Sequence, residues 1–248
     1  HRAVWSALLL AGVVAVLRRK PKLGLRQVGV LAATSVLISG NWLLFIWAVN
    51  EGRLLEASLG YFINPLVNVL LGVVFLGETL RRAQKLAVAL AAVGVSVLVF
   101  RLGHLPWISL TLAASFGLYG LLRKRFAIDP VVGLLVETAL MTPFALALLG
   151  WKAAEGTGAG VTWLLAASGV VTAVPLVLFT YGAQRLTLAT VGLMQYLAPT
   201  GQFLLAVLAF GEPFTASHLA AFACIWVSLA VYSGEAVWAS RRVSGATA

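Results

Sequence analysis

The sequence predicts an all-α integral membrane protein built from two inverted repeats, and three observations support this prediction. Of the 248 residues, 61% are hydrophobic and 10% are charged, and the mean hydropathy is +0.98. Apolar segments of bilayer-crossing length recur along the chain. A stretch in the first half of the chain also returns in the second half without a gap. A soluble fold is therefore excluded.

Nine apolar segments have the length of a spanning helix, which is roughly 20 residues for a hydrocarbon core about 30 Å thick. The predicted spans are residues 3–18, 28–49, 54–76, 84–100, 106–122, 130–150, 161–183, 188–210 and 217–237. The connections are short and leave no room for a soluble domain. The single cysteine, Cys224, lies in the last span, which excludes a disulfide framework and a thiolate cluster for a metal.

The formal charge of +10 comes from an excess of Lys and Arg. These residues fall mainly on one side of the predicted membrane. One side holds 14 of them, namely Arg18, Arg19, Lys20, Lys22, Arg26, Arg81, Arg82, Lys85, Arg123, Lys124, Arg125, Arg185, Arg241 and Arg242. The other side holds 4, namely Arg2, Arg53, Arg101 and Lys152. By the positive-inside rule the richer side is cytoplasmic, which places His1 outside and Ala248 inside. The charge is a topology signal, and no nucleic-acid partner is expected.

The internal repeat appears when the chain is shifted by 134 residues, which lays NPLVNVLLGVVFLGE (64–78) on APTGQFLLAVLAFGE (198–212). Pro65 then meets Pro199. Five spans separate the copies, so they cross the membrane in opposite directions, as in many secondary transporters. Similar composition of apolar helices is the alternative explanation, but the coincident Pro, Gly and Glu argue against it.

The repeat divides the chain into two predicted halves, residues 1–101 and 102–248. Span 106–122 has no counterpart 134 residues earlier, because that position precedes His1. The first half is therefore expected to lack its first helix.

Residues 41–80, NWLLFIWAVNEGRLLEASLGYFINPLVNVLLGVVFLGETL, closely resemble the RarD family of EamA-type permeases in the drug/metabolite transporter superfamily. HRAVWS (1–6) and QYLAPTGQFLLAVLAFGE (195–212) resemble the same family. The resemblance implies a ten-helix carrier of the bacterial inner membrane with a central cavity, of which this chain has nine helices. The first helix, absent here, helps to line the cavity in that superfamily. The family's description by chloramphenicol sensitivity implies small organic substrates.

A polar stripe interrupts span 54–76 at its centre. Its members share one helix face at i, i+3, i+4 and i+7, and they are Tyr61, Asn64, Pro65 and Asn68. The repeat reproduces the stripe in span 188–210 as Gln195, Pro199 and Gln202. Lipid cannot satisfy amides at this depth, so the stripes are expected to face each other across a midplane cavity. The alternative is that the amides bond neighbouring helices, at about 0.6 kcal/mol each.

Other polar and aromatic groups near mid-membrane depth extend this prediction. Trp42 lies far from the interfacial belt that most tryptophans favour, and Tyr119 lies on the polar face of span 106–122. The predicted substrate-binding residues are Asn41, Trp42, Tyr61, Asn64, Asn68, Tyr119, Gln195, Tyr196 and Gln202. The predicted hinges are Pro65, Pro175 and Pro199.

Glu137 is the one clearly intramembrane charge, about 10 Å from the cytoplasmic end of its span. It is the candidate for proton coupling, because intramembrane carboxylates often relay protons. The alternative is that it turns toward the cytoplasmic Arg123 and Arg125. Because no Lys or Arg is expected at mid-depth, the substrate is predicted to be neutral, zwitterionic or aromatic-bearing rather than a phosphate or dicarboxylate.

These features favour a multi-pass secondary transporter that works by alternating access, with a solute channel or a sensor without carrier activity as the alternative. The sequence has no nucleotide-binding loop, no metalloprotease motif and no cluster of titratable groups, so no enzyme, cofactor or metal is expected. The expected partners are a small-molecule substrate and the lipid bilayer. Small residues at four-residue spacing predict close helix packing, within one molecule or in a homodimer, and they are Ala83, Ala87, Ala91, Ser217 and Ala221.

Overall fold

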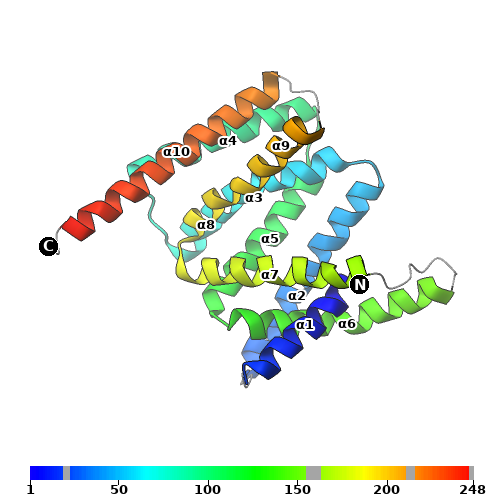
Figure 1. Ribbon diagram of the computed structural model, residues 1–248. Coiled ribbons are helices and arrows are strands. Elements are labelled where there is room, and N and C mark those ends of the chain that lie inside the picture. The colour runs from blue at the N-terminus through cyan, green and yellow to red at the C-terminus, as the bar shows by residue number, and fades with distance from the viewer. Residues whose placement is uncertain (19–22, 155–162, 211–215, 246–248) are drawn as a thin grey trace. The chain divides into compact units, whose positions relative to one another are not determined.

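The computed structural model describes residues 1–18, 23–154, 163–210 and 216–245, and these residues form helices joined by short connections (Figure 1). The helices are α1 (Arg2–Val16), α2 (Leu25–Asn50), α3 (Leu54–Leu76), α4 (Arg82–Leu102), α5 (Trp107–Phe126), α6 (Pro130–Ala154), α7 (Trp163–Arg185), α8 (Leu188–Gln195), α9 (Leu197–Phe210) and α10 (Ala216–Gly245). Some side chains, mainly in α9 and at both ends of α10, lie outside the described part. The predicted all-α architecture is confirmed.

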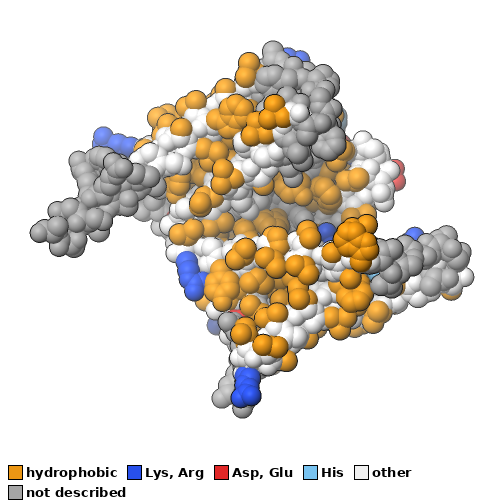
Figure 2. All heavy atoms as spheres, in the orientation of Figure 1, with side chains coloured by type: hydrophobic (Ala, Val, Ile, Leu, Met, Phe, Trp, Pro, Cys, Tyr) orange, Lys and Arg blue, Asp and Glu red, His pale blue; other side chains and the backbone are white. Residues whose placement is uncertain are grey.

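Five helices within the described residues are long and apolar enough to cross a membrane, with mean hydropathies of 1.8 to 2.0. They are α2, α3, α4, α6 and α7, while α1 and residues 219–235 of α10 are shorter apolar helices. Large apolar side chains such as Phe144 and Leu208, each 80% exposed, lie on the outside. Figure 2 shows hydrophobic side chains over much of the visible described surface. A surface of this kind fits lipid rather than water.

Contacts between residues divide the chain into two compact units. Unit 1 comprises residues 1–40 and 122–185, and unit 2 comprises residues 41–121 and 186–248. Helices α2 and α5 each contribute one end to each unit. Each unit thus combines parts of both predicted halves. The halves themselves remain a prediction from the sequence repeat.

In unit 1, α1 packs against α6 and α7. Ser6 Oγ, which is fully buried, donates to the Gly169 carbonyl oxygen at 3.0 Å. A Cβ on Gly169 would lie 2.7 Å from the backbone carbon of Trp5, so this approach requires glycine. Helices in lipid gain little from the hydrophobic effect and depend on such close packing and hydrogen bonds.

In unit 2, α4 packs along α10 through small residues. Ala87, Ala91 and Ala221 are completely buried, and a Cβ on Gly94 would lie 2.8 Å from the Ala221 carbonyl oxygen. Ser228 Oγ donates to the Ala87 carbonyl oxygen at 2.7 Å. The close packing that these alanines predicted therefore occurs within one molecule.

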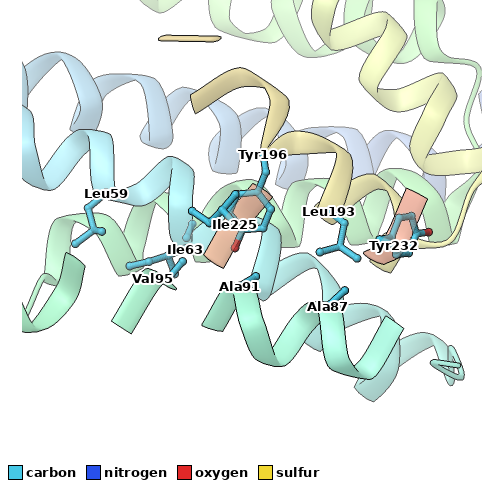
Figure 3. Packing of buried hydrophobic residues seen from close by; sticks show 10 residues of the cluster. Leu59, Ile63, Ala87, Ala91, Val95, Leu193, Tyr196, Ile225 and Tyr232 are labelled. Atoms are coloured by element: carbon cyan, nitrogen blue, oxygen red, sulfur yellow. The ribbon is translucent and has the colours of Figure 1, made fainter. Parts of the chain in front are cut away.

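Helices α4 and α10 also share the apolar core of unit 2 with α3 and α8, as Figure 3 shows. Leu59 and Ile63 of α3 and Leu193 of α8 lie among the α4 and α10 side chains of this core. Tyr196, which follows α8, is completely buried in it. The core therefore holds α3 and α8 together near the centre of the predicted polar stripes.

The predicted span 188–210 is not one continuous helix, because α8 ends at Gln195 and α9 begins at Leu197. Pro199 is the physical reason, since it has no N–H to donate to the carbonyl oxygen four residues earlier, at Gln195. Proline is tolerated in the first turn of a helix, and Pro199 is the third residue of α9. In contrast, Pro65 lies inside α3, which continues on both sides of it.

Glu78 fixes the start of α8 against the end of α3. Its Oε1 accepts from the Leu188 N–H at 2.7 Å and its Oε2 from the Ala189 N–H at 3.1 Å. Gly77 adopts φ +65°, which turns the chain back. A Cβ on Gly72 would lie 2.4 Å from the Glu78 carboxylate, so Gly72 leaves the space that this carboxylate fills. The Gly-Glu pair thus caps the positive N-terminus of α8.

Candidate substrate site

The polar stripe of α3 is mostly buried in unit 2. Asn68 is completely buried, Asn64 is 8% exposed, and Pro65 is buried between them in sequence. Tyr61 differs from these residues, because it is 44% exposed and its ring packs edge-on against Phe45, with the ring centroids 5.9 Å apart. The stripe predicted from spacing is therefore an inner pair of amides with a tyrosine at its more open end.

Both asparagines of the stripe bond the same residue of α8. The Nδ2 atoms of Asn64 and Asn68 donate to Oε1 of Gln195, at 3.1 Å and 2.7 Å. Gln195 is the last residue of α8, directly before the break at Tyr196. The structure thus brings together one amide of the second predicted stripe and both amides of the first. We call Asn64, Asn68 and Gln195 the amide cluster.

Helices α3 and α8 cross closely beside the amide cluster. A Cβ on Gly192 would lie 2.6 Å from the Pro65 carbonyl oxygen, so only glycine permits the approach. Tyr196 Oη donates to the Phe62 carbonyl oxygen at 3.1 Å. Phe62 and Tyr196 are 134 residues apart, which is the shift of the internal repeat. Equivalent residues of two copies related by a two-fold axis can touch only near that axis, so the axis that the sequence repeat predicts would pass beside the amide cluster.

The amide cluster leaves two polar atoms without partners among the described residues. Both Oδ1 of Asn64 and Oδ1 of Asn68 are buried and accept no hydrogen bond. Gly117 of α5 covers the second of these oxygens, since a Cβ there would lie 3.7 Å from it. A buried acceptor without a donor costs roughly 1–3 kcal/mol. The cluster is therefore an incomplete hydrogen-bond network in this conformation.

The other predicted site residues lie in different surroundings. Asn41 Nδ2 donates to the Leu112 carbonyl oxygen at 2.8 Å and to Ser115 Oγ at 2.9 Å, which ties α2 to α5. Trp42 is partly buried. Tyr119 is completely buried, and its ring centroid is 5.9 Å from that of Phe116.

The predicted hinge Pro175 and the predicted binding residue Gln202 are not part of the described amide cluster. Pro175 lies inside α7 and belongs to unit 1. Gln202 belongs to α9, and its side chain lies outside the described residues. The second stripe is consequently represented in the described cluster by Gln195 alone.

Unit 1 has a polar centre of another kind, an ion pair between Arg123 of α5 and Glu137 of α6. Both side chains are completely buried, with Nη1 and Oε1 3.7 Å apart. Thr34 Oγ1 of α2 donates to the same carboxylate oxygen at 2.5 Å, and Arg123 Nη2 donates to the Pro130 carbonyl oxygen at 3.2 Å. Gly133 makes room for the guanidinium, because a Cβ there would overlap it.

Arg123 is buried beside Glu137, which corrects the expectation that it lies in a cytoplasmic connection. The sequence places it in a basic run after span 106–122, but α5 continues to Phe126 and its side chain is completely buried. The helical spacing carries the missed signal: Thr111, Ser115, Tyr119 and Arg123 recur every four residues, so the polar face of span 106–122 extends to Arg123. The alternative in which Glu137 turns toward the arginines comes closest to this geometry.

A pocket of about 380 Å³ in unit 2 lies at the N-terminus of α8 rather than at the amide cluster. Its lining includes Glu78, Arg81 and Glu235. Arg81 and Glu235 form an ion pair at 2.9 Å across it. Asn64, Asn68 and Gln195 do not line this pocket, and the two asparagine Oδ1 atoms of the amide cluster are buried.

Comparisons with known proteins identify the family. The sequence pattern of the EamA-like transporter family matches residues 1–100 and 105–234. The chain belongs to this family. RarD of Escherichia coli K12 is 46% identical in an alignment of 255 positions that covers 98% of this chain and 86% of RarD. An uncharacterized transporter of Vibrio cholerae is 48% identical in an alignment of 244 positions that covers 94% of this chain and 81% of that protein.

A solved crystal structure shares the fold, with a TM-score of 0.64, 22% sequence identity, and coverage of 98% of this chain and 89% of the other. The resemblance to RarD is thus confirmed, and the chain is a RarD-like member of a membrane transporter family. Its apolar helices and its family fit a multi-pass protein of the inner membrane. The family names indicate transport rather than catalysis.

Proposed function

We propose that this protein is a secondary transporter that moves a small neutral, zwitterionic or aromatic-bearing organic solute across the bacterial inner membrane by alternating access. The amide cluster is its substrate site, and Pro65, Pro175 and Pro199 are the hinges. The C-terminus lies in the cytoplasm, as the distribution of Lys and Arg favours.

The observation that carries the proposal is the contact between Phe62 and Tyr196 beside the amide cluster, two residues that the repeat predicts to be equivalent. Transporters built from inverted repeats bind substrate near the interface of the repeats, often where helices are discontinuous. Here α8 and α9 are separated at Tyr196, and Gln195 adjoins that break. A site beside the axis is contacted in both the outward-open and the inward-open state, which alternating access requires.

The buried charges of unit 1 support a substrate without net charge. Arg123 and Glu137 compensate each other at 3.7 Å, so the pair presents no net charge to a substrate. Glu137 remains the proposed residue for proton coupling, because it is a buried carboxylate in a transporter. Its contacts with Thr34 and Arg123 also support a structural role, and the two roles differ in whether flux responds to a proton gradient.

Counterflow in proteoliposomes tests the carrier mechanism. Vesicles loaded with an unlabelled metabolite should take up the same labelled metabolite transiently above its equilibrium level, and the initial rate should saturate. A channel would equilibrate the label without overshoot, and a sensor would move none of it. Either result over a broad panel of metabolites would contradict the proposal. If the flux does not change with a proton gradient, proton coupling through Glu137 is contradicted, and the carrier mechanism is not affected.

A further inference from the structure

We infer that the amide cluster binds its substrate through an N–H donor, a primary ammonium or an amide group. This inference rests on the proposed function and names the chemistry of the substrate at the same site. A carboxylate or a phosphate is not the group that enters the cluster.

The first argument is the unpaired acceptors. Gln195 Oε1 already accepts from two asparagines, at 3.1 Å and 2.7 Å. The Oδ1 atoms of Asn64 and Asn68 are buried without any donor among the described residues. Since each unpaired acceptor is costly, a group that supplies N–H bonds is favoured there. An ammonium has three donors and an amide nitrogen one or two, and neither ammonium nor amide N–H is repelled by these oxygens.

The second argument is the local absence of charge along both helices of the site. Neither residues 57–77 nor residues 186–211 contain an Asp, Glu, Lys or Arg. Glu56, the nearest charge before the cluster on α3, is eight residues from Asn64, which is about 12 Å along a helix. A substrate carboxylate would therefore lose its water with neither a cation nor, at these oxygens, a donor to replace it. An ammonium finds no counter-charge on these segments either, but its N–H groups gain the two amide oxygens as acceptors, and a neutral amide gains them without the cost of burying a charge.

The third argument concerns the orientation of the amides. Turning all three by 180° would let Gln195 Nε2 donate to both asparagine oxygens and would leave both Nδ2 groups unpaired. Buried N–H groups without acceptors are rarer in proteins than buried carbonyl oxygens that lack donors. The orientation described, with free oxygens, is therefore the more stable one. It sets the preference of the site for donors.

Access to these oxygens requires α5 to separate from α3. Gly117 of α5 covers Asn68 Oδ1, and both asparagine oxygens are buried. Alternating access includes a state in which the site opens. In the conformation described, both acceptors are enclosed, and opening of the site would expose them to the donor of the substrate.

The test is binding of two probes that differ only in the polar group, 2-phenylethylamine and 3-phenylpropionate, to the purified protein by titration calorimetry. The parent should bind the amine about 10-fold or more tightly than the acid. Asn68→Asp should strengthen amine binding, because a carboxylate offers the ammonium only acceptors and a negative charge. Asn68→Leu should weaken amine binding about 5-fold to 150-fold, the range expected for one lost hydrogen bond.

Ser96→Ala is the matched control, since the Ser96 hydroxyl bonds its own helix at Ala92 and lies outside the cluster. It should leave both affinities unchanged. Equal or tighter binding of the acid by the parent would overturn the inference without any variant having to fold. Acid-preferring binding with intact counterflow would overturn the donor inference alone. Amine-preferring binding without counterflow of any probe would overturn the carrier mechanism alone.

Discussion

Unit 1 and unit 2 both bury polar side chains between their helices, but they do so with different chemistry. Unit 1 encloses two full charges, Arg123 and Glu137, with Thr34 bonded to the carboxylate. Unit 2 encloses three neutral amides, Asn64, Asn68 and Gln195. The segments that carry them, residues 57–77 and 186–211, contain no charged side chain. The charges of the first centre balance, although Arg123 Nε and Nη1 have no hydrogen-bond partner among the described residues, and the second centre leaves two acceptors without a donor there.

The difference indicates which polar centre is structural and which is available to a ligand. A buried ion pair is strongly destabilised when one partner is removed, because the other charge remains in a medium of low polarity. Neutral amides cost less to bury and can exchange one partner for another. The difference supports the proposal that the amide cluster binds substrate. The charged centre is expected to stabilise unit 1, and a proton-coupling role of Glu137 would come in addition to that.

The largest effect is expected from breaking the ion pair of unit 1. Glu137→Gln should lower the free energy of unfolding by about 3–5 kcal/mol, because Arg123 is left buried without a counter-charge. Replacing both residues, as Arg123→Met with Glu137→Leu, should restore most of the loss. Thermal unfolding of the purified protein in one detergent measures the parent and both variants.

Arg125→Gln is the control for this experiment, since Arg125 lies two residues from Arg123 but is exposed. It should change stability by no more than about 0.5 kcal/mol. If Glu137→Gln were as stable as the parent, the charged centre would not hold unit 1 together. The contrast between the two units would then fail.

A smaller effect is expected where α3 and α8 cross in unit 2. Gly192→Ala places a Cβ 2.6 Å from the Pro65 carbonyl oxygen, so the helices must separate, at about 1–3 kcal/mol. Gly182→Ala in α7 is the matched control, because no atom lies within 4 Å of its added Cβ. Equal stability of the two variants would show that the crossing beside the amide cluster is not close.

The smallest effect on the fold is expected from single cysteine substitutions that test which side of the membrane a connection faces. They are made in the Cys224→Ser variant, so that the added cysteine is the one labelled. Thr79 and His104 are both exposed and lie in the connections at opposite ends of α4. An impermeant maleimide should reach Thr79→Cys from the cytoplasmic side and His104→Cys from the periplasmic side. Neither variant should alter stability measurably. Reversed labelling of both would invert the proposed topology.

Much of the fold could be predicted from the sequence because lipid imposes simple rules. Apolar length predicts nine spans, and five of the described helices are long and apolar enough to cross a membrane. The shift that relates Pro65 to Pro199 also relates Phe62 to Tyr196, which touch in the structure. The break at Tyr196 was not predicted, since a proline signals a lost hydrogen bond but not whether a helix bends or ends. Pro65 and Pro199 differ in this outcome.

The candidate site could be predicted in part. Helical spacing brought Asn64 and Asn68 to one face, and the repeat added Gln195. Spacing could not show that both asparagines share one acceptor, because that depends on the rotamers of side chains from two helices. Arg123 was assigned to the cytoplasmic surface because a basic run usually marks topology. Its burial depends on Gly133 and Glu137, which lie on another helix.

The central claim, that the amide cluster binds substrate rather than only joining helices, is tested most directly by Asn68→Leu. Unfolding free energy and substrate affinity should be measured on the same preparation. Leucine removes one hydrogen bond to Gln195 and a buried oxygen that has no partner among the described residues. Stability should therefore change by only about 0.6 kcal/mol, while affinity falls about 5-fold to 150-fold. Unchanged affinity, or a loss of binding explained by unfolding, would contradict the claim.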